Sequence, residues 1–162
     1  MGGLGCRDTL RLEGGMCLYG AEMTEDINPI DCGLMWQLTK RRREKLLKGE
    51  DYFYGGDALK ELLKTPPARR RVGLTSKGPC ARDHNEIQDA QGNVVGFVTS
   101  GSPSPAGGGQ NIHQAFVKDG LHKIGTEGLQ LVVRNKKVPT KIAKLPFVEG
   151  KYYRAPSKNA SK

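Results

Sequence analysis

The sequence predicts an α+β fold, in which a helical and loop-rich N-terminal part is followed by an antiparallel β-barrel. Helical spacing of apolar residues dominates the first 65 residues, at Leu4–Glu13 and Ala58–Leu63. After Ala68 the apolar runs are short and recur with turn residues between them, which is typical of strands in a small barrel or sandwich. Pro66 and Pro67 separate the two patterns, so we place a domain boundary there.

The first element is predicted to be a helix over Leu4–Glu13 that ends at Gly14–Gly15. Arg7 and Arg11 then lie one turn apart on one face, a like-charge pair that costs roughly 0.2–0.5 kcal/mol in an isolated helix. Asp8 can pair with Arg11 at i,i+3, which leaves Arg7 near the helix N-terminus, where a cation is disfavoured. Arg7 is therefore either a surface or interdomain ion-pair residue, or a residue that binds an anionic or carbonyl-bearing ligand.

The segment after this helix is predicted to be an acidic connecting arm, Tyr19–Asp31. Ile30–Thr39 has evenly spaced apolar residues that include the single tryptophan, which favours a strand with one buried face. The four cations of Lys40–Arg43 would form the solvated edge that closes it. A short helix over Ala58–Leu63, capped by Asp57, completes the N-terminal part.

Six apolar runs are predicted to form the barrel: Val72–Thr75, Glu86–Gln88, Val94–Ser100, Ile112–Val117, Leu129–Arg134 and Val138–Leu145. Asp89–Asn93 is predicted to be a hairpin turn, because Gly92 can adopt positive φ. Residues alternate most clearly in Leu129–Val133, and Asn135–Lys137 turns the chain back, so one face of this hairpin is core and the other solvated. Gly101–Gln110 is predicted to be a surface loop, without the motif of a phosphate cradle.

Charge is unevenly distributed along the chain. The 26 Lys and Arg against 17 Asp and Glu give +9 at pH 7, which predicts attraction to nucleic acid, an anionic membrane surface or an acidic protein. The first 31 residues are acidic, and the positive excess lies in Lys40–Arg43, Arg69–Arg71, Lys136–Lys144 and the tail Glu149–Lys162. In this tail, Tyr152 and Tyr153 belong to no apolar period, so part of the tail is predicted to be fixed in place.

The sequence contains no complete catalytic or metal-binding motif. Its four cysteines are Cys6, Cys17, Cys32 and Cys80, and they form no CxxC pair. The three histidines are not spaced to join them at zinc, so we expect no metal and buried or idle thiols in a reducing compartment. No serine or cysteine lies in a nucleophile frame, and His84, His113 and His122 are predicted to be satisfied surface residues. No bilayer-spanning run or targeting segment is readable.

Several motifs, in order and spacing, resemble one family. They are GLGCRDTLRLEGGMCLYG, NPIDCGLMW, KRRR, RRRVGL, GNVVGFVTSGSPSP and KLPFVEGKYY. They resemble the C-terminal half of aminomethyltransferase, the T protein of the glycine cleavage system. The resemblance covers nearly the whole chain, with Cys6 at a position where the family more often has alanine.

The resemblance implies a fold and a reaction. Residues 1–65 would be the C-terminal part of a folate-binding α/β domain, residues 66–148 the family's β-barrel and residues 149–162 a tail. The cofactor would be tetrahydrofolate, whose N5 takes the methylene carbon of an aminomethyl group on the lipoyl arm of H protein, with release of ammonia. Arg7 and Tyr152 match folate-contacting residues of the family. Thr99–Ser104 matches a family motif to which we assign only a structural or cavity-facing role.

The resemblance also implies what lies elsewhere. The family's essential aspartate and the glutamate that reads the pterin belong to an N-terminal half that no stretch here matches. We therefore expect no catalytic residue in this chain, which we interpret as a C-terminal fragment with little or no transferase activity alone. A eukaryotic member would work in the mitochondrial matrix, and otherwise the location would be cytoplasmic. H protein is typically acidic, so Lys40–Arg43 or Arg69–Arg71, which appear in the sequence without nearby carboxylates, are predicted to contribute to docking.

Two alternatives remain open from the residues. One is a folate-binding relative that transfers no methylene group, such as the tail of a sarcosine or dimethylglycine dehydrogenase. The other is an RNA-binding module, because Lys40–Lys48 followed by Tyr52–Tyr54 places charge beside aromatic rings. Aromatic residues make up only 6% of the chain, however, and no RNP-like pattern is present.

Overall fold

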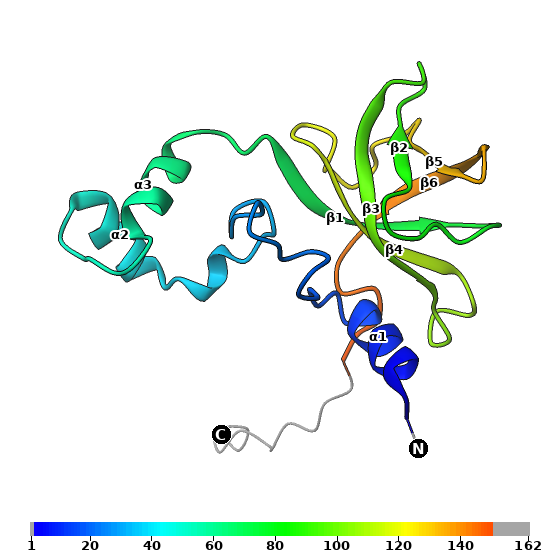
Figure 1. The fold of residues 1–162 in the computed structure, drawn as a ribbon, viewed down its shortest axis with the longest axis horizontal. Helices are drawn as coiled ribbons and strands as arrows, with labels where there is room; N and C mark the ends of the chain where they lie inside the picture. The colour runs from blue at the N-terminus through cyan, green and yellow to red at the C-terminus, as the bar shows by residue number, and fades with distance from the viewer. Residues whose placement is uncertain (1, 151–162) are drawn as a thin grey trace, which may run out of the picture.

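The computed structural model describes residues 2–150, which form three α-helices, one 3₁₀ helix and a closed six-stranded antiparallel barrel (Figure 1). The helices are α1 (Leu4–Glu13), η1 (Met35–Gln37), α2 (Lys40–Lys48) and α3 (Gly56–Lys64). The strands are β1 (Arg69–Ser76), β2 (Glu86–Gln88), β3 (Val94–Pro103), β4 (Asn111–Lys118), β5 (Gln130–Val133) and β6 (Lys136–Ala143). The predicted α+β class with a C-terminal antiparallel barrel is confirmed.

The barrel encloses the hydrophobic core. Its strands are ordered β1-β4-β3-β2-β5-β6, and β6 pairs with β1 to close the cylinder. Each strand contributes a buried apolar side chain to one cluster, for example Leu74, Ile87, Val98, Val117, Leu131 and Ile142. In β6 the residues alternate as predicted, since Val138 and Ile142 are buried and Lys141 is exposed. Burial of such side chains contributes about 1.5–3 kcal/mol each.

Both predicted turns in the barrel are present. Gly92 has φ 89°, and the Asp89 N–H donates to the Asn93 carbonyl at 3.0 Å. The β5–β6 turn lies one residue earlier than predicted, at Arg134 and Asn135, which have φ 50° and 63°. Two central residues with positive φ match the twist of a tight hairpin.

The predicted strand over Ile30–Thr39 is wrong. This segment consists of turns that lead into η1, and Trp36 is 76% exposed. The Asn28 side chain accepts the backbone N–H groups of the second and third residues after it, and Gly33 has φ 69°. These interactions hold the backbone in turns, so the even apolar spacing has no sheet to join.

The cations of Lys40–Arg43 form the first turn of α2 instead of a strand edge. Thr39 accepts the Arg42 N–H at 3.3 Å and caps this helix. The helix predicted at Ala58–Leu63 is present within α3, but Gly55 is its N-cap residue and Asp57 lies in its first turn. In Figure 1, α2 and α3 lie to one side of the barrel, whereas α1 lies beneath it.

His113 is buried in the barrel, which contradicts the predicted surface position. Its side chain comes from β4, whose residues Asn111–Val117 are all buried because the barrel core covers one face and the N-terminal segment packs on the other. His113 Nε2 lies 2.9 Å from the Ser76 hydroxyl, and its Nδ1 has no hydrogen-bond partner within the described residues. Burial lowers the pKa of His113 to about 4, so the imidazole is neutral at pH 7.

This lowered pKa predicts a loss of stability in acid. A histidine in the unfolded chain has a pKa of about 6.5. Between that pH and about pH 4, the histidine at position 113 is protonated in the unfolded chain but neutral in the folded protein. The free energy of unfolding should therefore fall by about 3 kcal/mol across this window. Urea unfolding at a series of pH values measures it. His113→Gln should flatten the dependence and His84→Gln, at an exposed histidine, should not. Equal pH slopes in wild type and His113→Gln would refute the assignment.

Candidate functional site

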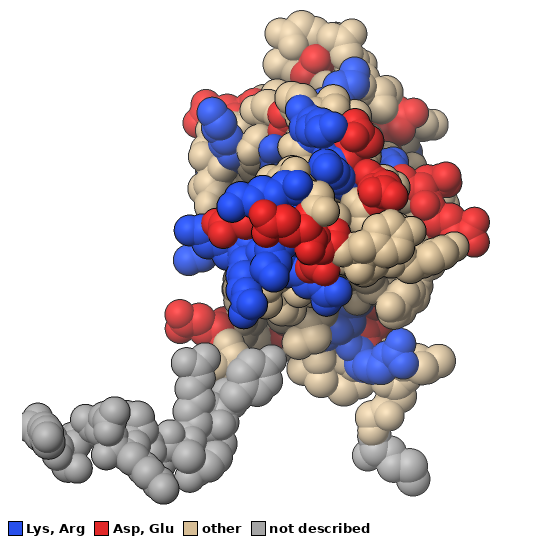
Figure 2. All heavy atoms as spheres, turned by 90° about the vertical axis from the view of Figure 1, so that its left-hand side faces the viewer, with Lys and Arg blue, Asp and Glu red and all other residues tan. Residues whose placement is uncertain are grey.

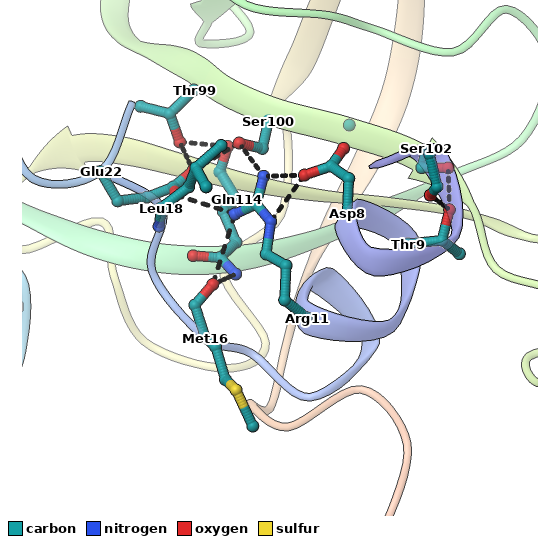
Figure 3. A network of polar contacts seen from close by, with 12 residues as sticks. Asp8, Thr9, Arg11, Met16, Leu18, Glu22, Thr99, Ser100, Ser102 and Gln114 are labelled. Carbon is teal, nitrogen blue, oxygen red and sulfur yellow. Dashed lines mark hydrogen bonds and ion pairs between the residues drawn. The ribbon is translucent and has the colours of Figure 1, made fainter. Parts of the chain in front are cut away.

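A buried carboxylate joins the N-terminal arm to the barrel. Glu22 lies between α1 and η1 and is fully buried. Its oxygens accept hydrogen bonds from Thr99 Oγ1 (2.6 Å), Ser100 Oγ (2.6 Å), Leu18 N (2.8 Å) and Arg11 Nη1 (2.9 Å), as Figure 3 shows. A buried anion is tolerated only when its acceptor sites are filled in this way.

Arg11 supplies the positive charge of this site. Its side chain is 10% exposed and projects from α1 toward β3 (Figure 3). It contacts Asp8 at 2.7 Å, Glu22 at 2.9 Å and the Ser100 hydroxyl at 2.7 Å. The predicted pairing of Asp8 with Arg11 is confirmed. The sequence does not indicate the contact between Arg11 and Glu22, because these two residues are 11 positions apart and do not share a helix.

A second arginine contacts the chain on both sides of the arm. Arg71 of β1 donates to the Gly15 carbonyl at 2.9 Å, the Cys32 carbonyl at 2.8 Å and Gln114 Oε1 at 2.8 Å. Gln114 in turn donates to the Met16 carbonyl at 2.9 Å. The arm is therefore held to β1 and β4 through its backbone.

The end of α1 is tied to the barrel separately. The Glu13 carboxylate accepts from the Ser104 hydroxyl at 2.5 Å and from the Ala106 N–H at 3.0 Å. Ser104 and the pair Thr99 and Ser100 all lie in Thr99–Ser104, so this segment has a structural role, one of the two roles that the resemblance left open. These contacts orient α1 against β3 and β4.

Arg7 lies outside this network. It is exposed on α1, and its guanidinium forms no hydrogen bond or ion pair with any residue from 2 to 150. Leu4 and Leu10, also exposed, lie three positions before and after it. We call Leu4, Arg7 and Leu10 the α1 outer face. Tyr152, the other candidate ligand residue, lies outside the described residues.

The described residues contain little with which to perform bond-making chemistry. No three His, Cys, Asp or Glu side chains in residues 2–150 are placed to hold a metal ion. Ser76 and His113 form a serine–histidine pair, but both are buried and no acid contacts His113 Nδ1 in this part of the chain. No helix within the described range is long and apolar enough to cross a bilayer. On the α1 outer face, the Arg7 guanidinium is an exposed group of a kind that suits an anionic or carbonyl acceptor.

The premise that the two basic runs lack nearby carboxylates is wrong. The ion pairs are Arg69–Asp31 (3.1 Å), Arg70–Asp119 (2.5 Å), Arg42–Asp51 (2.9 Å) and Lys40–Glu44 (3.9 Å). Figure 2, which faces α2 and α3, shows Lys and Arg side chains mixed with Asp and Glu. Folding brings partners together that are up to 49 positions apart, which local inspection of a charge run cannot detect.

Comparisons with known proteins agree on one family. The family model described as the glycine cleavage T-protein C-terminal barrel domain matches residues 69–149. The mitochondrial aminomethyltransferases of Flaveria trinervia and Gallus gallus are 48% and 44% identical to this chain, over 94% of it and 36% and 37% of their own lengths. The crystal structure of glycine cleavage system aminomethyltransferase T from Bartonella henselae has a TM-score of 0.84 at 38% identity, covering 94% of this chain and 40% of that one. The chain thus spans little more than a third of the curated relatives it matches.

We predict that Glu22→Gln lowers the free energy of unfolding by at least about 2 kcal/mol, because an amide has one acceptor oxygen where the carboxylate has two, so donors that the carboxylate satisfies in the interior lose their acceptor. Glu25→Gln is the matched control, since Glu25 is exposed in the same arm and should change stability by less than about 0.5 kcal/mol. Urea denaturation of the three proteins gives both values. A Glu22→Gln variant as stable as Glu25→Gln would show that the buried charge does not hold the arm.

Proposed function

Because this chain belongs to the glycine cleavage T-protein family, we propose that it is the C-terminal part of a tetrahydrofolate-dependent aminomethyltransferase. The full reaction would move the methylene carbon of an aminomethyl group on the lipoyl arm of H protein to tetrahydrofolate and release ammonia. The observation that carries the proposal is the match of the barrel over residues 69–149, joined to relatives that are named aminomethyltransferases. In a eukaryote the location would be mitochondrial, as the names of the relatives suggest, with the matrix implied by the family resemblance alone.

The proposal includes the division of the chain. Residues 1–65 would complete a folate-binding domain, residues 66–148 would be the barrel domain and residues 149–162 a tail. The arm and α1 reach the barrel through Arg11, Glu13 and Glu22. The described part of this first segment, residues 2–65, contains three short α-helices and η1, which bury few apolar side chains outside these contacts. We therefore expect it to fold only together with the barrel.

Arg7 is the proposed folate ligand in the described part of the chain. Its planar fork of donors is suited to a carboxylate or to the carbonyl of a pterin ring, and no described side chain occupies it. Bound tetrahydrofolate would supply the nucleophilic nitrogen, so that this chain needs only to bind and orient it. Tyr152 is proposed as a second contact on its match to the family motif alone. The chain by itself is proposed to be inactive, since the family's essential aspartate belongs to an N-terminal half that no stretch here matches.

H protein is the proposed macromolecular partner, and α2 is the better of the two candidate docking elements. Arg69 and Arg70 are occupied by Asp31 and Asp119. Arg41 and Arg43 of α2 form no ion pair within residues 2–150 and remain available to an acidic surface.

An RNA-binding function is the second candidate, because Tyr52 and Tyr54 are exposed directly after α2. It would require RNA affinity that decreases steeply as salt increases.

We predict that Arg7→Ala weakens binding of tetrahydrofolate by at least about tenfold, since a charge-assisted hydrogen bond contributes about 1.5–3 kcal/mol. Calorimetric titration of the chain, alone and mixed with a separately expressed N-terminal part of the Bartonella henselae relative, measures the affinity. Arg41→Ala, at an exposed arginine of α2, is the control and should bind as wild type does.

Equal affinities of wild type and Arg7→Ala would exclude Arg7 as the ligand residue. The same preparations test the activity. The chain alone should form no methylenetetrahydrofolate from aminomethyl-loaded H protein, and vigorous turnover by the chain alone would contradict the proposed division of labour.

A further inference from the structure

The path of the arm brings two cysteines together that no sequence motif connects. Arg71 donates to the carbonyls of Gly15 and Cys32, so one guanidinium holds the chain before Cys17 beside Cys32 itself. Glu22 contacts both parts of the chain, because its carbonyl accepts the Cys32 thiol at 2.8 Å and its carboxylate accepts the N–H of the residue after Cys17. These contacts place the two residues at one site.

The two thiols are neighbours and differ in character. The neighbouring Cys32 thiol and the Arg71 guanidinium lower the pKa of Cys17 to about 7, although partial burial opposes this. Proximity to Cys17, together with burial, raises the pKa of Cys32. Cys17 is half-buried and can be reached from solvent, whereas Cys32 is 1% exposed. One thiol thus forms a thiolate near neutral pH beside another that keeps its proton.

We propose that Cys17 and Cys32 form a peroxide-sensitive dithiol that closes to a disulfide across the arm. The Cys17 thiolate attacks one oxygen of a hydroperoxide, so an S–O bond forms, the O–O bond breaks, and the leaving oxygen takes a proton to become an alcohol or water. The Cys32 sulfur then attacks the Cys17 sulfenic acid, an S–S bond forms, and water leaves with the Cys32 proton. Two thiols are oxidised and one peroxide is reduced.

The disulfide would change how the arm is held. It removes the hydrogen bond from the Cys32 thiol to the Glu22 carbonyl and closes a covalent loop around Glu22. The arm would then be fixed to itself as well as to β1 and β4. This site is separate from the α1 outer face and does not depend on methylene transfer.

The test is peroxide treatment of the whole 162-residue chain near neutral pH, followed by alkylation and peptide mapping without reduction. We expect a cross-linked peptide containing Cys17 and Cys32, with Cys80 alkylated. Cys6 is exposed, so the experiment is repeated in Cys6→Ser to remove links between molecules, and the internal disulfide should be unchanged. Cys80→Ser is a second control with the same expectation.

Single variants separate the two roles. In Cys32→Ser the sulfenic acid on Cys17 should accumulate and react with dimedone, whereas Cys17→Ser should slow thiol loss at this site by roughly tenfold or more. Circular dichroism establishes that each variant is folded. The proposal is overturned if Cys17 and Cys32 are both alkylated after peroxide treatment, or if wild type and Cys32→Ser accumulate equal amounts of oxidised Cys17 without a cross-link.

Discussion

The arrangement of the N-terminal segment depends on one buried charge, that of Glu22. A carboxylate withdrawn from water is strongly unfavourable unless donors surround it. Glu22 meets this requirement by contacts to both neighbours of the arm, with Arg11 on α1 and the hydroxyls of Thr99 and Ser100 on β3. The arm follows the path on which these donors can all reach the carboxylate, and α1 is held beside the barrel as a consequence.

This constraint gives two arginines on one helix opposite roles. Arg11 points toward the barrel, where it pairs with Asp8 and Glu22 and donates a hydrogen bond to Ser100. Arg7, one turn earlier, stays exposed on the α1 outer face. A structural cation therefore anchors the helix while its neighbour is left available for a ligand. The proposed folate contact of Arg7 thus depends on the Arg11–Glu22 ion pair, because that pair holds the helix on which Arg7 lies.

The sequence was sufficient where structure is determined by neighbours along the chain. The bounds of α1 follow from apolar spacing and the Gly14–Gly15 stop, and the strands of the barrel follow from alternation and turn residues. The sequence was not sufficient where contacts between residues far apart along the chain determine the structure. Asn28 and Gly33 turned an apparent strand into turns, and contacts from β1, β3 and β4 buried His113 and Glu22. Of the candidate site, Arg7 is a prediction from its motif and missing local partner, whereas Arg11 and Arg71 have long-range partners that no local pattern indicates.

Hydrogen exchange of the α1 amides, compared with those of β4, tests most directly whether the Glu22–Arg11 pair holds α1 on the barrel. In Arg11→Met the α1 amides should exchange about 100-fold faster than in wild type, while β4 amides in the core change much less, because the loss opens the helix locally. Arg7→Met, which alters the exposed arginine of the same helix, should leave α1 exchange close to that of wild type. Unchanged α1 protection in Arg11→Met, or equal acceleration in both variants, would contradict the account.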